Sequence, residues 1–270
     1  MAKISVTGHK GKIGSELVKL GYEPLECDVT DLDQVNDEIH RVKPDVIIHC
    51  AAISDVAYCE NKENMDKVFA VNVRGVSNIL YDFYGIFIYL STVHVFNGEK
   101  YWDYSERHQP SPINTYGFTK WAGETISDYG TCRSVVVRIS KTFSMESIQD
   151  TLYNLQNGES QEFPTFIKRS FNHVSHCAEG ISWLAENVHT IPDLKLINIA
   201  GTDTLSYYQF WQWAARTFEL DEKLIISRKH EIDLPPRPFR GGLSTRLASK
   251  LGVPLYSAID GLKKIKNERN

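Results

Sequence analysis

Short apolar runs and amphipathic segments alternate along the first half of the chain. The apolar runs predict strands at residues 4–6, 25–27, 44–52 and 86–90. The segments between them predict helices at about residues 15–20, 32–42 and 64–81. The run at 44–52 is apolar almost throughout, which is typical of a parallel strand with both faces buried. Strands that alternate with helices predict a doubly wound α/β sheet, which binds ligands at the carboxyl ends of its strands.

The pattern is looser after residue 140. It predicts helices at about 147–157 and 206–220, a further helix that residues 172–180 lead into and that ends at about 186, and short strands at 163–166 and 196–201. The helix at 206–220 carries six aromatic residues, and such a stripe at helical spacing usually faces a core.

Length, net charge and cysteine spacing limit the classes of protein to which this chain could belong. A chain of 270 residues is long enough for one large domain or a domain with a small lobe. The net charge of −4 argues against a nucleic-acid surface, and no apolar run approaches membrane-spanning length. The start of the chain does not read as a signal peptide, and the five cysteines follow no metal-type spacing. We therefore expect a cytoplasmic protein with reduced thiols, no metal site, and no nucleic-acid or membrane partner.

A glycine-rich turn follows the first strand. Gly8, Gly11 and Gly14 stand at Gly-x-x-Gly-x-x-Gly spacing between that strand and the first helix. This order suits a dinucleotide, because glycines let the backbone approach a pyrophosphate at a helix N-terminus. An ordinary glycine-rich connection is the alternative. Asp28 lies 20 residues after Gly8, where an acid commonly binds the adenosine ribose, although Asp28 or Asp31 could instead cap the next helix.

Tyr116 and Lys120 lie four residues apart at the start of a predicted helix, and so share one face. A phenol beside an ammonium group is a candidate acid/base pair, because the positive charge lowers the pKa of the tyrosine from about 10 toward neutrality. Taken alone, the pair could equally be a helix surface.

Taken in order, these motifs resemble the extended short-chain dehydrogenase/reductases, and most closely the dTDP-4-dehydrorhamnose reductase group. The motifs are Thr7-Gly8 with Gly11 and Gly14, Asp28-Val29, Cys50-Ala51-Ala52, Asn72, Ser91-Thr92, Val95-Phe96-Asn97-Gly98, Tyr116 with Lys120, and Arg237-Pro238. The resemblance is strong to about residue 140 and weaker afterwards.

The resemblance implies a Rossmann-type sheet with a smaller C-terminal substrate lobe. Residues 1–140 would bind NADP(H) or NAD(H), about 168–200 would return to that domain, and about 141–167 and 201–270 would form the lobe. The resemblance implies that Tyr116 is the proton donor and that Lys120 lowers the pKa of this tyrosine. It also implies that the Thr92 hydroxyl donates a hydrogen bond to the substrate carbonyl. The expected cofactor residues are Gly8, Lys10, Gly11, Lys12, Ile13, Gly14, Asp28, Val29, Cys50, Ala51, Ala52, Asn72, Tyr116 and Lys120. The expected substrate residues are Val93, His94, Lys141, Asn172, Arg237 and Arg240.

The chain departs from that group beside the expected catalytic residues. Val93 and His94 replace an aspartate and a tyrosine, and Lys141 replaces a tryptophan. On an extended segment His94 would point to the same side as Thr92, so we expect it to enter the substrate pocket, with a histidine satisfied inside its loop as the alternative. The expected substrate is a nucleotide-activated keto-deoxysugar other than dTDP-4-dehydrorhamnose.

Several alternatives stay open. The chain could be an epimerase or dehydratase of the same superfamily, although Val93 lacks the carboxylate that elimination needs. It could also be a cofactor-binding regulatory subunit like that of methionine adenosyltransferase. Asp28 favours NAD(H), unless Asp28-Val29 contacts adenine and Lys10 or Lys12 takes a 2′-phosphate. The basic loop at 234–242 could hold a diphosphate through Arg237 and Arg240 or simply face solvent. We expect a monomer or homodimer.

Overall fold

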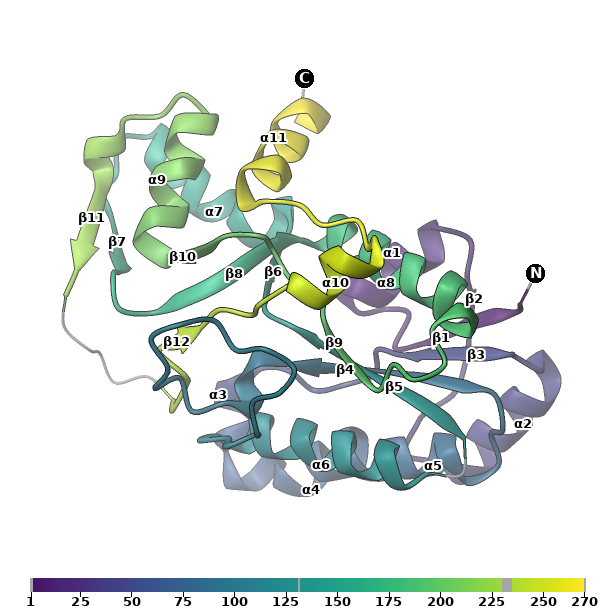
Figure 1. The fold of residues 1–270 in the computed structure, drawn as a ribbon. Helices are drawn as coiled ribbons and strands as arrows, with labels where there is room; N and C mark the ends of the chain where they lie inside the picture. The colour runs from purple at the N-terminus through teal and green to yellow at the C-terminus, as the bar shows by residue number, and fades with distance from the viewer. Residues whose placement is uncertain (1, 131, 230–234, 270) are drawn as a thin grey trace.

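The computed structural model describes residues 2–130, 132–229 and 235–269 (Figure 1). Leu234, which opens the expected basic loop, lies outside the described residues. The central element is a six-stranded sheet in the order β2-β1-β3-β4-β5-β9, with every neighbouring pair parallel. Its strands are β1 (Ile4–Thr7), β2 (Glu23–Pro24), β3 (Val46–His49), β4 (Ile86–Thr92), β5 (Arg133–Ile139) and β9 (Leu196–Asn198). The predicted doubly wound fold is confirmed.

The strand order reverses between β1 and β3, because the chain runs outward from β1 to β2 and returns on the other side of β1. A crevice at such a reversal is where open α/β sheets bind ligands. The second strand lies just before the predicted residues 25–27 and ends three residues earlier than predicted. The Leu25 amide still donates to the Val6 carbonyl (2.9 Å), but the Glu26 amide donates to the Glu38 carboxylate (2.8 Å), which ends the ladder.

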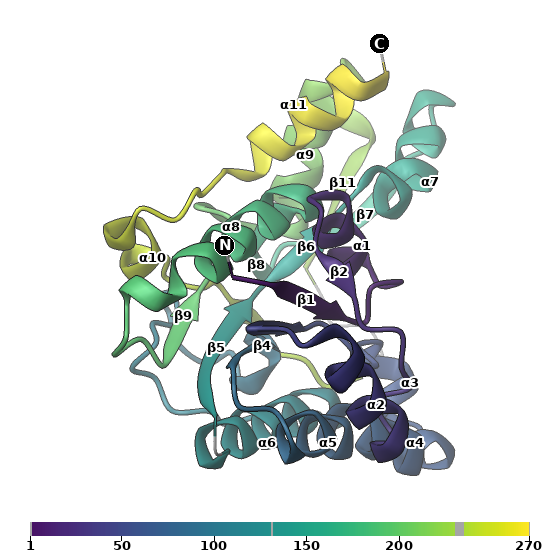
Figure 2. The same ribbon diagram turned by 90° about the vertical axis from the view of Figure 1, so that its right-hand side faces the viewer.

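Helices cover both faces of the sheet (Figures 1 and 2). One face packs on α1 (Lys12–Lys19) and α8 (Val174–Asn187), where Leu17 and Ile181 are fully buried beside Ile48. The other face packs on α2 (Leu32–Val42), α5 (Gly75–Tyr81) and α6 (Thr115–Tyr129), with Ile79 buried against Phe87. Burying each such side chain contributes roughly 1.5–3 kcal/mol, so the sheet is a rigid platform for its loops.

The helix predicted at 64–81 contains an irregular turn. It runs through α4 (Met65–Phe69), a π-helical turn (Ala70–Arg74) and α5. A π turn reorients the side chains that it carries. Asn72 in this turn is buried and accepts from the Ile53 amide (2.8 Å), while its Nδ2 donates to the Ile53 carbonyl (2.9 Å) and to Thr119 Oγ1 (3.0 Å). Asn72 therefore ties the segment after β3 to α6.

The lobe has small sheets and a separate aromatic core. Its strands are β6 (Lys141–Phe143), β7 (Gln161–Pro164), β8 (Lys168–His173), β10 (Thr204–Ser206), β11 (Ile225–Arg228) and β12 (Arg240–Gly241). Its helices are α7 (Met145–Gln156), α9 (Tyr207–Thr217) and α11 (Ala258–Arg269). The short helix α3 (Val56–Glu60) packs against α6, and the short helix α10 (Arg246–Leu251) packs against the edge strand β9. Phe171 and Phe210 stack at 4.3 Å between ring centroids, with Trp211 beside them, so the aromatic helix packs in a core as predicted. No described helix is long and apolar enough to cross a membrane.

Candidate active site

A cleft of about 600 Å³ opens at the carboxyl ends of the central strands and continues to the lobe. Its floor includes residues of the glycine-rich turn and of the segments after β3 and β4. The side of the cleft that faces the lobe is formed by residues of β6, β8 and the loop before β12. The cleft therefore lies at the reversal of strand order and joins both halves of the chain.

The glycine-rich turn is built for close backbone approach. Gly8 has φ of +65°, and a Cβ there would lie 2.5 Å from the Ala51 amide nitrogen. A Cβ on Gly14 would collide with the Gly8 carbonyl. Helix α1 starts at Gly11 without a side-chain cap, so its first N–H groups are left for an anion in the cleft. The turn thus fits the pyrophosphate of a dinucleotide.

The expected cofactor residues fall into two groups. Those that line the cleft are Gly11, Lys12, Ile13, Gly14, Cys50, Ala52, Tyr116 and Lys120. Those that do not are Gly8, Lys10, Asp28, Val29, Ala51 and Asn72. Asp28 Oδ1 accepts from the Thr30 amide (2.9 Å) and hydroxyl (2.8 Å), so this carboxylate is engaged in its own turn. Asp31, and not Asp28, caps α2.

Helix α6 positions the expected proton donor. Asn114 caps the helix by accepting from the Gly117 amide (2.7 Å), and Tyr116 and Lys120 follow one turn apart. The pKa of Tyr116 is raised to about 12 by burial, which its hydrogen bond with Thr92 partly opposes. Tyr116 therefore holds its proton at neutral pH. The expected lowering of the tyrosine pKa by Lys120 is not found, because desolvation dominates.

Lys120 is itself strongly perturbed by its surroundings. Burial lowers its pKa to about 7, and Glu124 and Cys50 act in the opposite direction. Its Nζ lies 4.1 Å from the centroid of the Tyr89 ring, which favours the charged form but cannot replace water. Lys120 is thus poised between its two protonation states near neutral pH.

A buried ion pair fixes α6 against the sheet. Glu124 accepts from Arg138 Nε (2.9 Å) and Nη2 (2.6 Å), and Ser91 donates to the same carboxylate. The Arg138 guanidinium also lies 5.0 Å from the Phe96 ring centroid. Removing one partner of such a pair typically costs about 3–5 kcal/mol, because the other charge stays buried. The pair therefore holds Tyr116 in place relative to Thr92 on β4.

His94 reaches the cleft by a different route from the one predicted. Val93–Val95 forms a single 3₁₀ turn instead of an extended segment, because Thr92 Oγ1 accepts from the His94 amide (3.2 Å). Asn114 Nδ2 donates to His94 Nδ1 (3.0 Å) and to the Pro236 carbonyl (2.8 Å), which places the ring proton on Nε2. Burial, with Arg169 and Arg237 nearby, lowers the pKa of His94 to about 3. His94 is thus a neutral residue of the cleft wall.

The substrate side of the cleft is strongly basic. Of the expected substrate residues, Val93, His94, Lys141 and Arg237 line it, whereas Asn172 and Arg240 do not. Arg240 lines an adjoining cavity of about 830 Å³, which shares Arg237 with the cleft. The charged residues that line the cleft are Lys12, Lys120, Lys141, Arg169, Arg237 and Asp55. Five basic side chains and one acidic one give this cleft a charge opposite to that of the whole chain.

Arg169 is the main lining residue that sequence analysis missed. It is 4% exposed and donates to the Lys168 carbonyl (2.7 Å), but it pairs with no carboxylate among the described residues. Burial lowers the pKa of the Arg169 guanidinium. Tyr207 opposes this shift, and the positive charge of Arg237 adds to it. Its sequence signal is weak, since a lone arginine in an unassigned polar segment is usually a surface residue. Ser140 and Tyr207 also line the cleft without having been predicted.

A metal site is not found in the part of the chain that the structure describes, where no three His, Cys, Asp or Glu side chains cluster suitably. His176 instead stacks on Tyr256 with ring centroids 3.9 Å apart.

The fold and the cleft together define a Rossmann-type protein of the extended short-chain dehydrogenase/reductase class. Residues 2–265 match the family described as "RmlD substrate binding domain", and the chain belongs to that family. This confirms the resemblance seen in the sequence.

The chain is similar to several named proteins, although its sequence identity to them is low. It is 33% identical over 156 residues to dTDP-4-dehydrorhamnose reductase of Aggregatibacter actinomycetemcomitans, which covers 53% of this chain and 52% of that one. It is 26% identical to methionine adenosyltransferase 2 subunit beta of Rattus norvegicus over 81% of this chain and 72% of that one. The crystal structure of dTDP-4-dehydrorhamnose reductase from Bacillus anthracis str. Ames in complex with NADP shares the fold, with a TM-score of 0.88, 22% identity and 99% coverage of both chains.

Proposed function

We propose that this protein is an NAD(P)H-dependent reductase of the keto group of a nucleotide-activated deoxysugar. The observation that carries the proposal is the grouping of Thr92, Tyr116 and Lys120 on one cleft, between a glycine-rich turn and a basic wall. We also propose that the turn and central sheet hold the dinucleotide, and that the lobe holds the sugar nucleotide.

The protonation state of Tyr116 suits reduction. The bound dinucleotide would supply a hydride to the carbonyl carbon, and the resulting alkoxide needs a proton. With a pKa of about 12, Tyr116 carries that proton at neutral pH. Thr92 is hydrogen-bonded to the phenol and would donate to the same substrate oxygen. Lys120, charged in about half of the molecules near pH 7, stabilises the phenolate left after proton transfer.

The positive charge of the cleft supports the binding of two diphosphate groups. Five basic residues and one acidic residue leave a surplus of between three and four positive charges near pH 7, because Lys120 is charged in about half of the molecules. Two diphosphates, one from the dinucleotide and one from a sugar nucleotide, would neutralise this surplus. We assign Arg169 and Arg237 to the second diphosphate, because both face the lobe side of the cleft. Lys141, where the related reductases have an aromatic wall, makes the sugar end more polar and favours a sugar other than dTDP-4-dehydrorhamnose.

A non-catalytic, dinucleotide-binding regulatory subunit is the second candidate. Its support is the similarity to methionine adenosyltransferase 2 subunit beta and the buried Val93 beside Thr92. An epimerase or dehydratase is less well supported. Asp55, the one carboxylate of the cleft lining, caps α3 by accepting from the Tyr58 amide (2.7 Å).

Turnover separates these candidates. Purified protein is given NADH or NADPH and a panel of 4-keto sugar nucleotides, and dinucleotide oxidation is followed. Wild type should oxidise the dinucleotide, and Tyr116→Phe should lose at least about 100-fold in kcat, the usual size of a general-acid contribution, with unchanged dinucleotide affinity. Binding without turnover for every sugar would favour the regulatory subunit. Equal turnover in Tyr116→Phe would refute its role as donor.

A further inference from the structure

Glu26 stands at the carboxyl end of β2, directly beside the glycine-rich turn. Strands β1 and β2 pair in parallel as far as Val6 and Pro24, and Glu26 follows Pro24 by two residues. His9 Nε2 is 3.5 Å from Glu26 Oε1, which joins the turn to this carboxylate. In a Rossmann-type sheet, this corner is where the adenosine ribose of a dinucleotide lies.

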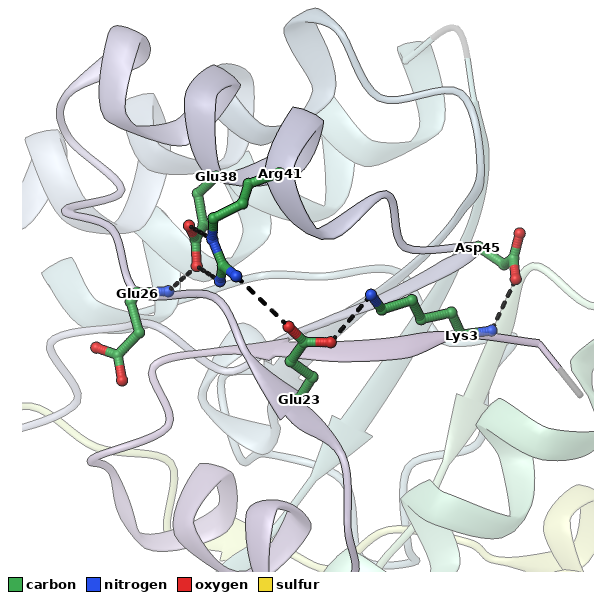
Figure 3. Close-up of polar contacts among 6 residues, drawn as sticks. All are labelled: Lys3, Glu23, Glu26, Glu38, Arg41 and Asp45. Atoms are coloured by element: carbon green, nitrogen blue, oxygen red, sulfur yellow. Dashed lines mark hydrogen bonds and ion pairs between the residues drawn. The ribbon is translucent and has the colours of Figure 1, made fainter.

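The backbone of Glu26 is held while its side chain is left available. Its amide donates to Glu38 Oε1 (2.8 Å), and Arg41 binds the same carboxylate through Nε and Nη2 (both 2.7 Å). In Figure 3 the Glu26 carboxylate points away from this network. The side chain is 59% exposed, and among the described residues His9 is its one ionic partner.

The cations near Glu26 are committed elsewhere. Arg41 is bound by Glu38 and lies 3.8 Å from Glu23, and Lys3 Nζ lies 3.1 Å from the same Glu23 carboxylate (Figure 3). Neither is aimed at the corner beside the turn. The pKa of Cys27, next to Glu26, is raised to about 11 by burial and further by Glu38, Asp28 and Glu26. The carboxylates of Glu38, Asp28 and Glu26 thus all lie close enough to Cys27 to raise its pKa.

We infer that Glu26, and not Asp28, receives the hydroxyls of the adenosine ribose, and that the protein selects NADH over NADPH. This inference rests on the proposed dinucleotide site. A carboxylate accepts hydrogen bonds from both ribose hydroxyls, whereas a 2′-phosphate would bring up to two negative charges against it. Asp28 cannot replace Glu26, because its carboxylate already accepts two hydrogen bonds from Thr30.

The test measures binding of NADH and NADPH separately, by titration calorimetry, with the full chain. Wild type should bind NADH at least about 10-fold more tightly, the size of one unfavourable charge contact. Glu26→Gln should bring the two affinities to within a few-fold, mainly by strengthening NADPH binding. Asp28→Asn is the matched control, since it removes the same charge two residues away, and it should keep the wild-type ratio.

A second pair of probes needs no variant. ADP-ribose should bind wild type at least about 10-fold more tightly than its 2′-phosphorylated analogue, and added salt should reduce this difference. A wild-type preference for the 2′-phosphorylated ligands, or a ratio that changes in Asp28→Asn and not in Glu26→Gln, would overturn the inference. Selective NADH binding without turnover would refute the reductase and leave the role of Glu26 standing.

Discussion

The two sides of the cleft present different chemical groups, main-chain atoms on one side and long polar side chains on the other. The side proposed for the dinucleotide consists largely of main-chain groups and small residues, with Lys12 and Ile13, from two short stretches (11–14, and Cys50 with Ala52) that follow the paired strands β1 and β3. The substrate side consists of long polar side chains from segments as far apart as His94, Lys141, Arg169 and Arg237. The first side is specified by backbone geometry and the second by tertiary packing. This contrast predicts that substitutions on the first side change the fold, whereas those on the second change affinity.

The strongest test of this contrast is Gly8→Ala. The left-handed backbone at Gly8 costs an alanine about 1–2 kcal/mol, and its Cβ would in addition press on the Ala51 backbone. We expect a loss of about 3 kcal/mol or more in unfolding free energy, measured with urea, together with loss of dinucleotide binding. Gly21→Ala is the control, because Gly21 also has positive φ but has nothing within 4 Å of the new Cβ. Equal losses in both variants would show that contact with Ala51 is unimportant.

Arg169→Met tests the other side of the cleft. The substitution removes a buried cation that has no carboxylate partner among the described residues, so the fold gains as much by losing the charge as it loses in contacts. We expect the KM for the sugar nucleotide to rise about 10–100-fold, the effect of one charge-assisted contact, with unchanged dinucleotide affinity and thermal stability. Arg216→Met, at an exposed pair with Glu222, serves as the control. A loss of dinucleotide binding in Arg169→Met would contradict the division of the cleft.

The smallest effect, counted per pH unit, concerns Lys120, which lies where the two sides meet. Its folded pKa of about 7 lies below the unfolded value of about 10.4, so between these values the unfolded chain binds a proton that the folded chain lacks. Folding stability should therefore rise with pH above 7, by up to about 1.4 kcal/mol per pH unit, and the penalty should be complete below 7. Urea unfolding of wild type and Lys120→Met at several pH values measures this as a difference in slope. Parallel curves would show that Lys120 is charged in the fold.

Local features of the fold and site could be predicted from the sequence. The glycine-rich turn, the small residues after β3, and Tyr116 and Lys120 on one helix face all depend on neighbours within a few positions. The orientation of Asn72 could not be predicted, because it depends on a π turn that contacts Ile53 and Thr119. Glu26 escaped notice for a similar reason, since the register of β2 against β1 decides which acid faces the turn.

The substrate side was predicted only in part, for a physical reason. Lys141 and His94 were found because they replace expected residues in a familiar motif. Arg169 has no such motif, and its position depends on β8 pairing with β12 and on packing over Gly241. The pKa of Tyr116 was misjudged because the sequence reveals the nearby lysine but not the burial that outweighs it.

Asn114 joins three separate segments through its one side chain. Its side-chain oxygen holds the Gly117 amide in the first turn of α6, and its nitrogen holds both His94 and the Pro236 carbonyl. Movement of Pro236, which lines the adjoining cavity, away from Asn114 would break a hydrogen bond to the residue that caps the helix of Tyr116. Asn114 thus links the segment at Pro236 to the helix that carries Tyr116, and under the proposed function a sugar nucleotide that moved this segment would also shift its proton donor.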